Sequence, residues 1–379
     1  MTTAQATPPK PRRRWLQFSL RTLLVLILVL SAPLGWLAYK IRQAREQREA
    51  VRAIRQLSGT VEYDYHHDWR VYPPPPISSP TIAARPPRFV WLHELLRDDL
   101  FSNVDEVYLR SPDVTDDDLV HVVKLPRLRR LSLENTNVTD GGLERLSELH
   151  RLQELNLTHS RVTNAGLEHL ERLTKLEHLN LSGTQVTSAG LEHLKPLARL
   201  KRLDLSGTRV ADAGLERLQR HSQLKDLFLE DTQVTDAGLQ SLRNLTQLQR
   251  LRLNGTAVTD TGLEHLQGFT QLQELELSST QVTGAGFVHV GALTQLHEMW
   301  LDDSQVTDAG LVDLCGLTEL QRLRLNGTAV TDTGLFRLRN LTQLSDLQLF
   351  RTRVTDAGVA ELQKALPKCD IHANTERND

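Results

Sequence analysis

The sequence predicts a curved α/β solenoid that is attached to a membrane by one N-terminal helix. Two observations predict it: a unit of 24 residues that recurs along most of the chain, and an apolar run near the N-terminus. A fixed period of this length is typical of solenoids, in which each unit buries its apolar face only by stacking on its neighbours. The fold is therefore expected to be one continuous array.

The repeating unit reads L-x-x-L-x-L-x-x-T-x-V-T-D-x-G-L-x-x-L-x-x-L-x-x, and its register never slips. A weaker copy over residues 104–127 precedes the regular units, which gives about eleven repeats over residues 104–367. The leucines at one position are expected to form a core ridge. The regular units begin at Leu128, Leu152, Leu176, Leu200, Leu224, Leu248, Leu272, Leu296, Leu320 and Leu344.

Each unit predicts a strand, a turn and a helix. Residues 200–205 alternate apolar and polar side chains, as a half-buried strand does. Thr208 is expected to hydrogen-bond its neighbours in a hydroxyl ladder along the turns, and Asp212 to cap the helix. Leu215 and Leu218 then lie on one helical face. Identical units stacked in one direction give parallel strands joined by right-handed crossovers.

This pattern resembles the leucine-rich repeat family. The short repeat with T-D-x-G-L is similar to the repeats of bacterial membrane-anchored leucine-rich-repeat proteins and of the substrate-reading arrays of F-box proteins. The resemblance covers about 70% of the chain and implies a parallel concave sheet with convex helices. It leaves the function open, because the fold hosts many unrelated binding roles. Thr or Ser replaces the family's usual Asn after the strand, and no F-box-like domain precedes the array.

Residues 22–39 form a mostly apolar stretch that predicts a transmembrane helix. As a helix they would span ~27 Å, close to the hydrocarbon thickness of a bilayer. A cleaved signal peptide is the alternative, favoured by the basic residues 12–14, but no small-x-small cleavage site follows. Lys and Arg are nearly balanced across the stretch, so they do not set its orientation. The short tail before it favours a single-pass anchor with the repeats outside the cytoplasm.

The chain is therefore expected to contain five segments. They are a basic tail (1–21), the transmembrane helix (22–39), a juxtamembrane region (40–103), the solenoid (104–367) and a C-terminal cap and tail (368–379).

The juxtamembrane region has four expected parts. Residues 40–57 predict a basic helix that is suited to anionic headgroups, and residues 60–65 predict a strand. The proline-rich residues 72–87 predict an extended spacer, and residues 91–100 an amphipathic helix that caps the first repeat. At the other end, residues 362–371 predict an irregular final turn.

Charge is unevenly distributed along the chain. Residues 1–57 carry a net +9, which leaves −11 on residues 58–379 out of a total of −2. An acidic array is a poor candidate for nonspecific nucleic-acid binding, which depends on neutralising phosphates. No nucleophile motif, phosphate loop or zinc-ligand spacing is present in the sequence. We therefore expect no enzyme activity, cofactor, metal, nucleic acid or small-molecule substrate.

The outward-facing positions of the strands are where we expect a protein partner to bind. One column runs Asp226, Arg250, Glu274, Glu298, Arg322, Asp346, and the next runs Phe228, Arg252, Glu276, Trp300, Arg324, Gln348. Exposed aromatic residues flanked by arginines are typical of binding hot spots. The predicted contact residues are Phe228, Arg250, Arg252, Glu276, Trp300, Arg322, Arg324 and Phe350.

A duplication suggests that these residues form two similar patches. Residues 248–263 and 320–335 are identical and lie 72 residues apart, so a block of three repeats has been copied. Phe228 and Trp300 occupy equivalent places in the two copies. The alternative is that acids and arginines on strands ~4.8 Å apart only neutralise each other laterally, for a gain of ~0–1 kcal/mol per pair.

The sequence thus predicts a membrane-anchored scaffold that binds a protein on its concave face without catalysis. The alternative function is a cytoplasm-facing adaptor or substrate receptor, as the resemblance to F-box-type repeats implies.

Overall fold

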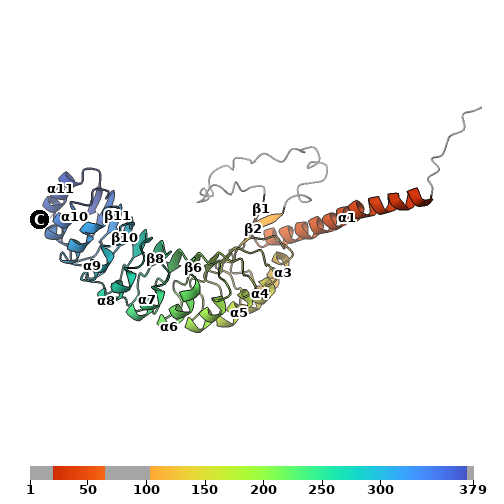
Figure 1. Ribbon diagram of the computed structural model, residues 1–379, viewed down its shortest axis with the longest axis horizontal. Helices are drawn as coiled ribbons and strands as arrows, with labels where there is room; N and C mark the ends of the chain where they lie inside the picture. The colour runs from red at the N-terminus through yellow and green to blue at the C-terminus, as the bar shows by residue number, and fades with distance from the viewer. Residues whose placement is uncertain (1–19, 65–102, 374–379) are drawn as a thin grey trace, which may run out of the picture.

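The computed structural model describes residues 20–64 and 103–373. Figure 1 shows an arc with strands along its inner side and short helices along its outer side, from which helix α1 (Leu20–Gln56) projects at the N-terminal end. Within the described residues, one sheet of 13 strands follows the order of the chain, β1 to β13. Only the first pair, β1–β2, is antiparallel. The predicted parallel solenoid is confirmed.

The strands and the convex segments alternate along the chain. The strands are β1 (Thr60–Tyr63), β2 (Val104–Tyr108), β3 (Arg130–Ser132), β4 (Glu154–Asn156), β5 (His178–Asn180), β6 (Arg202–Asp204), β7 (Asp226–Phe228), β8 (Arg250–Arg252), β9 (Glu274–Glu276), β10 (Glu298–Trp300), β11 (Arg322–Arg324), β12 (Asp346–Leu349) and β13 (Asp370–Ala373). The α-helices after α1 are α3 (Leu119–Val122), α4 (Asp140–Leu146), α5 (Asn164–Leu170), α6 (Asp212–Leu215), α7 (Asp236–Leu242), α8 (Asp260–Leu263), α9 (Phe287–Val290), α10 (Asp332–Leu338) and α11 (Asp356–Ala365). The 3-10 helices are η2 (Asp116–Asp118), η3 (Ser188–Leu194), η4 (Glu216–Arg220), η5 (Glu264–Leu266) and η6 (Gly310–Gly316).

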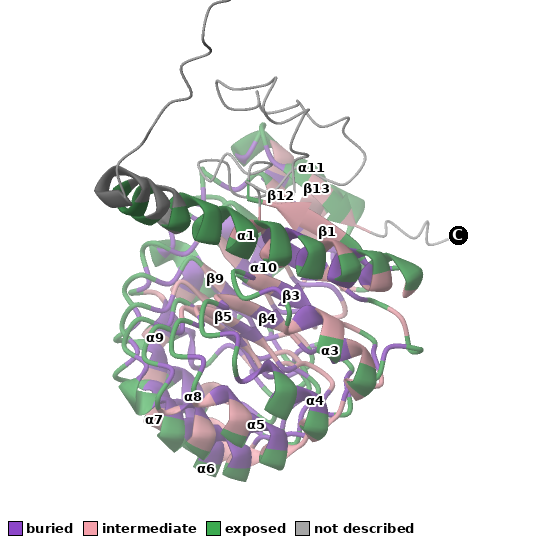
Figure 2. Cartoon of the chain, turned by 90° about the vertical axis from the view of Figure 1, so that its right-hand side faces the viewer, coloured by how far each residue is buried: buried purple, intermediate pink, exposed green. Residues whose placement is uncertain are grey.

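The core consists of leucine columns between the sheet and the convex helices. From β2 onward, each strand pairs with the next at a separation of 24 residues, so that Leu203 lies opposite Leu227. These leucines and those of the helices, such as Leu215, are fully buried, and Figure 2 shows the buried residues within the arc. Burying one leucine contributes ~1.5–3 kcal/mol. Because each column is covered by the adjacent repeat, stacking is the main source of stability.

Within the described repeats, the turn threonines do not form the predicted ladder between neighbours. The hydroxyl of Thr208 donates to the carbonyl of Leu205 in its own repeat (2.5 Å), and that of Thr256 donates to Leu253 (2.6 Å). The carbonyl three residues earlier lies at the end of the strand, within reach of the short side chain. Each hydroxyl therefore satisfies a buried backbone group of its own repeat.

The aspartate of the T-D pair has a different role from the predicted helix cap. The N-cap of α7 is Thr235, whose hydroxyl accepts from the amide of Ala237. Asp212, the first residue of α6, instead accepts from the next repeat. Its carboxylate oxygens are 2.8 Å from the amide nitrogen and 2.7 Å from the hydroxyl of Thr235. This contact fixes one convex helix to the following one.

We call this repeated contact the aspartate–threonine ladder. It explains the glycine of T-D-x-G-L, because a Cβ at Gly262 would lie 2.3 Å from the carboxylate of Asp236. The contact joins Asp116 to Thr139, Asp140 to Thr163, Asp212 to Thr235, Asp236 to Thr259, Asp260 to Thr283, Asp308 to Thr331 and Asp332 to Thr355.

The first repeat is capped by the second half of α1. Ala50 and Ile54, four residues apart, are fully buried where α1 packs on α3 and β1. The predicted strand near residue 60 is confirmed as β1, in which Val61 lies opposite Val107 of β2. The basic helix expected on headgroups over residues 40–57 therefore packs on protein. The cap helix and the spacer expected over residues 91–100 and 72–87 lie outside the described residues.

The predicted transmembrane helix over residues 22–39 is not confirmed. In the part of the chain that the structure describes, no helix is long and apolar enough to cross a membrane. These residues instead belong to α1, which includes Pro33 and continues to Gln56.

The C-terminal end is more regular than the predicted irregular turn. Helix α11 is followed by β13, which pairs in parallel with β12. Leu362 of α11 and Leu366 at its C-terminal end are buried. Ile371, which also belonged to the expected irregular turn, lies in β13 and so extends the sheet by one strand.

The aspartate–threonine ladder predicts a specific loss of stability. We expect Asp236→Ala to lower the free energy of unfolding by about 2 kcal/mol, because the amide and hydroxyl of Thr259 lose their acceptor. Urea unfolding of the full chain, followed by circular dichroism, measures the change. Asp236→Asn is the matched control, since Asn164 natively makes both contacts with Thr187. Equal losses in the two variants would contradict the role of the ladder.

Candidate interaction surface on the concave sheet

The middle of the concave sheet carries alternating arginine and aromatic side chains. The ring of Phe228 on β7 lies between two guanidinium groups, with the Cζ atoms of Arg202 and Arg252 at 4.7 and 4.5 Å from its centroid. Only 2% of Phe228 is exposed. The expectation that Phe228 is an exposed aromatic is therefore wrong. Arginines cover it because the faces of an aromatic ring attract a cation.

Trp300 on β10 continues the same arrangement. Its ring is approached by the Cζ atoms of Arg252 at 5.9 Å and Arg324 at 4.6 Å, and the side chain remains partly accessible. Arg252 therefore contacts both aromatic residues, and the two predicted patches join. We call Arg202, Phe228, Arg252, Trp300 and Arg324 the arginine–aromatic stack.

Carboxylates hold the guanidinium groups of the stack in place. The Nε atom of Arg252 donates to the carboxylate of Glu274 at 2.7 Å, and Arg324 pairs with Asp302 at 2.7 Å. Pairing of partly buried charges restricts their side chains before any partner arrives. The stack is thus a preorganised surface.

In the neighbouring column, which contains Arg250 and Arg322, arginines pair with acids on the adjacent strand. This is the lateral neutralisation that the sequence offered as an alternative. Arg250 donates two hydrogen bonds to Asp226, at 2.7 and 2.6 Å, and Arg322 pairs with Glu298 at 3.0 Å. Arg250 and Arg322 therefore lie beside the stack in charge pairs with the preceding strand.

Glu276 is a buried acid beneath the stack. Its side chain is fully buried, and Asn254 donates to one carboxylate oxygen at 2.5 Å. Burial, together with the adjacent Glu274, raises the pKa of Glu276 to about 8 against the opposing effect of Arg252. Glu276 therefore keeps its proton to a higher pH than an exposed glutamate does, and as a buried residue it supports the surface instead of lying on it.

Phe350 lies apart from the stack, next to the C-terminal edge. It is 38% exposed, and its ring stacks on His372 of β13 with centroids 6.4 Å apart. Arg202, Asp302 and His372 were not among the residues predicted from the sequence. Arg202 could have been predicted from the sequence. It extends the column of Asp226 and Arg250 by one strand toward the N-terminus, which makes it the diagonal neighbour of Phe228.

Among residues 20–64 and 103–373, no three His, Cys, Asp or Glu side chains meet as they would around a metal ion.

Comparison with known proteins identifies the repeat. Residues 109–370 match a family model described as a leucine-rich repeat region. No curated protein matches the sequence.

Solved structures resemble this fold at low sequence identity. An internalin from Listeria monocytogenes is 20% identical, with a TM-score of 0.49, and the match covers 76% of this chain and 94% of the internalin. The mouse RP105/MD-1 complex contains a chain that is 21% identical, with a TM-score of 0.52; the match covers 66% of this chain and 43% of the mouse chain. At these identities the likeness concerns the fold alone.

The raised pKa of Glu276 predicts a pH-dependent stability. The folded state keeps a proton that the unfolded chain releases above its ordinary pKa of 4.5, so stability falls as pH rises from about 5 to 8. We expect Glu276→Gln, which mimics the protonated acid, to reduce this decline and to raise the melting temperature at pH 8 relative to the native chain. Thermal unfolding at several pH values measures it. An unchanged slope in the variant would contradict the assignment.

Proposed function

The chain belongs to the leucine-rich repeat family, and from this premise we propose that it is a scaffold that binds a protein partner on its concave sheet and catalyses no reaction. The observation that carries the proposal is Trp300, an accessible indole between the guanidinium groups of Arg252 and Arg324. Tryptophan and arginine are among the residue types that are enriched in binding hot spots.

The low cost of ordering this surface also supports the proposal. The strands are fixed in a continuous parallel sheet, and the arginines are already paired with Glu274 and Asp302. Association normally loses about 0.5–1.5 kcal/mol for each flexible side chain that it immobilises. A partner that contacts the arginine–aromatic stack avoids part of that loss.

The predicted contact residues divide into two roles in this proposal. Direct contacts come from accessible side chains, and supporting residues hold these in place. The direct contacts are Trp300, Arg324, Phe350, Arg250 and Arg322, and the supporting residues are Phe228, Arg252 and Glu276.

Substitution of Trp300 tests the concave surface. We expect Trp300→Ala to weaken partner capture by the full chain about 10- to 100-fold, because a hot-spot side chain contributes at least ~2 kcal/mol. Quantitative affinity capture from native lysate, with circular dichroism to check folding, measures the loss. Glu168→Ala, at an exposed position of the convex helix α5, is the control. Equal capture by the two folded variants would move the binding surface away from the stack.

We also propose that the first half of α1 attaches the solenoid to a lipid bilayer. Large apolar side chains on this half are exposed, including Leu28 (72%), Val29 (63%) and Leu34 (60%). Contiguous exposed apolar surface of this kind marks a site of contact with membrane or protein. The second half of α1, which packs on the first repeat, would hold the array beside the bilayer.

Flotation with liposomes tests the attachment. We expect the full chain to float with neutral phosphatidylcholine vesicles, and a chain that begins at Lys40 to stay in the dense fraction, because only the first contains the apolar half of α1. Salt-resistant flotation would confirm apolar rather than charge-based attachment. Absence of the full chain from the floating fraction would contradict it. Protease treatment of intact cells then distinguishes extracytoplasmic repeats from the cytoplasmic adaptor.

A further inference from the structure

The convex face changes character in the last four repeats. One helix position holds an acid or amide in six consecutive repeats and then becomes apolar. The polar residues are Glu144, Glu168, Glu192, Glu216, Gln240 and Glu264, and the apolar ones are Val288, Val312, Phe336 and Ala360. We call the four apolar residues the convex stripe.

The convex stripe is exposed to solvent. Val288 on α9 is 60% exposed, Val312 on η6 is 42% exposed and Phe336 on α10 is 57% exposed. Adjacent helices lie ~8–10 Å apart, so the stripe crosses about 30 Å of surface. Exposed apolar side chains gathered in consecutive repeats in this way mark a site of contact.

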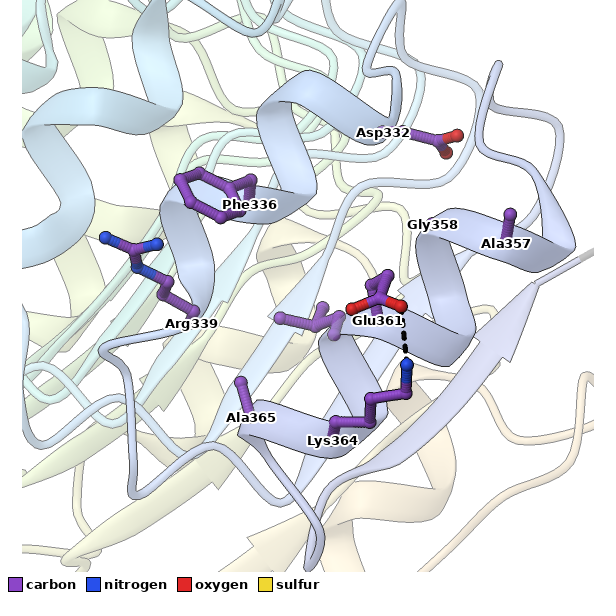
Figure 3. Close-up of a pocket in the computed structure, with 9 residues that line it drawn as sticks. Asp332, Phe336, Arg339, Ala357, Gly358, Glu361, Lys364 and Ala365 are labelled. Atoms are coloured by element: carbon purple, nitrogen blue, oxygen red, sulfur yellow. Dashed lines mark hydrogen bonds and ion pairs between the residues drawn. The ribbon is translucent and has the colours of Figure 1, made fainter.

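A hollow lies beside the stripe, between α10 and α11. It has a volume of about 600 Å³ and is lined by Phe336, Leu362 and Ala365 among others. Figure 3 shows Phe336 and Ala365 at the hollow, with the Glu361–Lys364 ion pair on α11 beside it. This space can receive aliphatic side chains from a partner.

The helix position that follows the stripe carries charges that complement themselves. The following helix position reads Arg145, His169, His193, Arg217, Ser241 and His265 in the earlier repeats, and none of these is acidic. Beside the stripe it reads His289, Asp313, Arg337 and Glu361. If a second copy of this row runs in the opposite direction, each acid of one copy lies opposite a basic residue of the other.

A two-fold axis parallel to the helices, between η6 and α10, would produce that reversal. Such an axis would place Val312 opposite Phe336 of the second copy, and Val288 opposite Ala360 of the second copy. Asp313 would then face Arg337 of the second copy, and His289 would face Glu361 of the second copy. A two-fold interface must be self-complementary in this way. Neither Asp313 nor Arg337 has an ion pair within the described part of the chain.

We propose that the convex stripe is a self-association surface, through which two copies of this chain form a closed dimer with their concave sheets facing apart. Asp308 and Asp332 of the second copy meet at the edge of this arrangement. Each carboxylate already accepts two hydrogen bonds from the next repeat, from Thr331 and Thr355 respectively. Two convex arcs touch over few helices, which agrees with a stripe confined to four repeats. Such a small interface gives a reversible dimer.

Sedimentation velocity of the full chain in nonionic detergent, over a range of concentrations, tests the dimer. We expect Val312→Glu/Phe336→Glu to raise the dimer dissociation constant at least ~10-fold. Folding should persist, because six earlier repeats hold Glu or Gln at this position. Glu216→Gln is the control on the polar part of the same column. If two copies associated through α1 instead, all variants would dimerise equally. A monomeric native chain, or equal dimerisation by the double variant, would overturn the proposal.

Charge reversal tests the two-fold geometry separately. Asp313→Arg and Arg337→Asp should each weaken the dimer, because like charges then face each other in both halves of the interface. An equimolar mixture of the two variants should recover it, since the mixed dimer again pairs each arginine with an acid. Failure of the mixture to associate more tightly than either variant alone would overturn the proposed arrangement.

Discussion

The leucines of one repeat lose contact with water only when the next repeat stacks on them in register. Leu203 and Leu227 illustrate this constraint, because each covers the other while both strands continue the same sheet. A one-residue shift would turn every buried leucine of that strand toward the solvent. The strict 24-residue spacing is therefore a packing requirement. The leucine packing sets the position of the backbone, and the polar contacts follow from that position.

The same register turns distant residues into surface neighbours. Phe228, Arg252 and Trp300 follow one another at separations of 24 and 48 residues along the chain, yet they stack as one group on the concave sheet. On the convex side, the register lines up Val288, Val312 and Phe336 as a stripe. The two surfaces face opposite directions, so the proposed partner site and the proposed dimer contact can be occupied together.

The ends of the array show how the stacking requirement is met where a neighbour is missing. At the N-terminal end, Ala50 and Ile54 of α1 cover the first repeat, and the antiparallel β1 adds the first strand. At the C-terminal end, α11 and β13 extend the sheet with buried Leu362 and Leu366. The cap and the exposed apolar half of α1 belong to one continuous helix. If that half binds a membrane, it would therefore hold the first repeat at a fixed position beside the membrane.

The sequence by itself determined the solenoid, the repeat boundaries and the leucine core, because a periodic apolar pattern has only one way to bury all its copies. It also placed most residues of the candidate surface, since adding 24 to a position gives its neighbour on the next strand. Only the tertiary structure decided how those side chains share contacts. The arginines could pair with acids or stack on rings, and their reach lets Arg252 do both, which buries Phe228 and joins the two expected patches. The aspartate of T-D could cap its own helix or bind the next repeat, and the close approach at the motif glycine favours the second. The cap by α1 likewise depended on a contact between segments that share no periodic pattern.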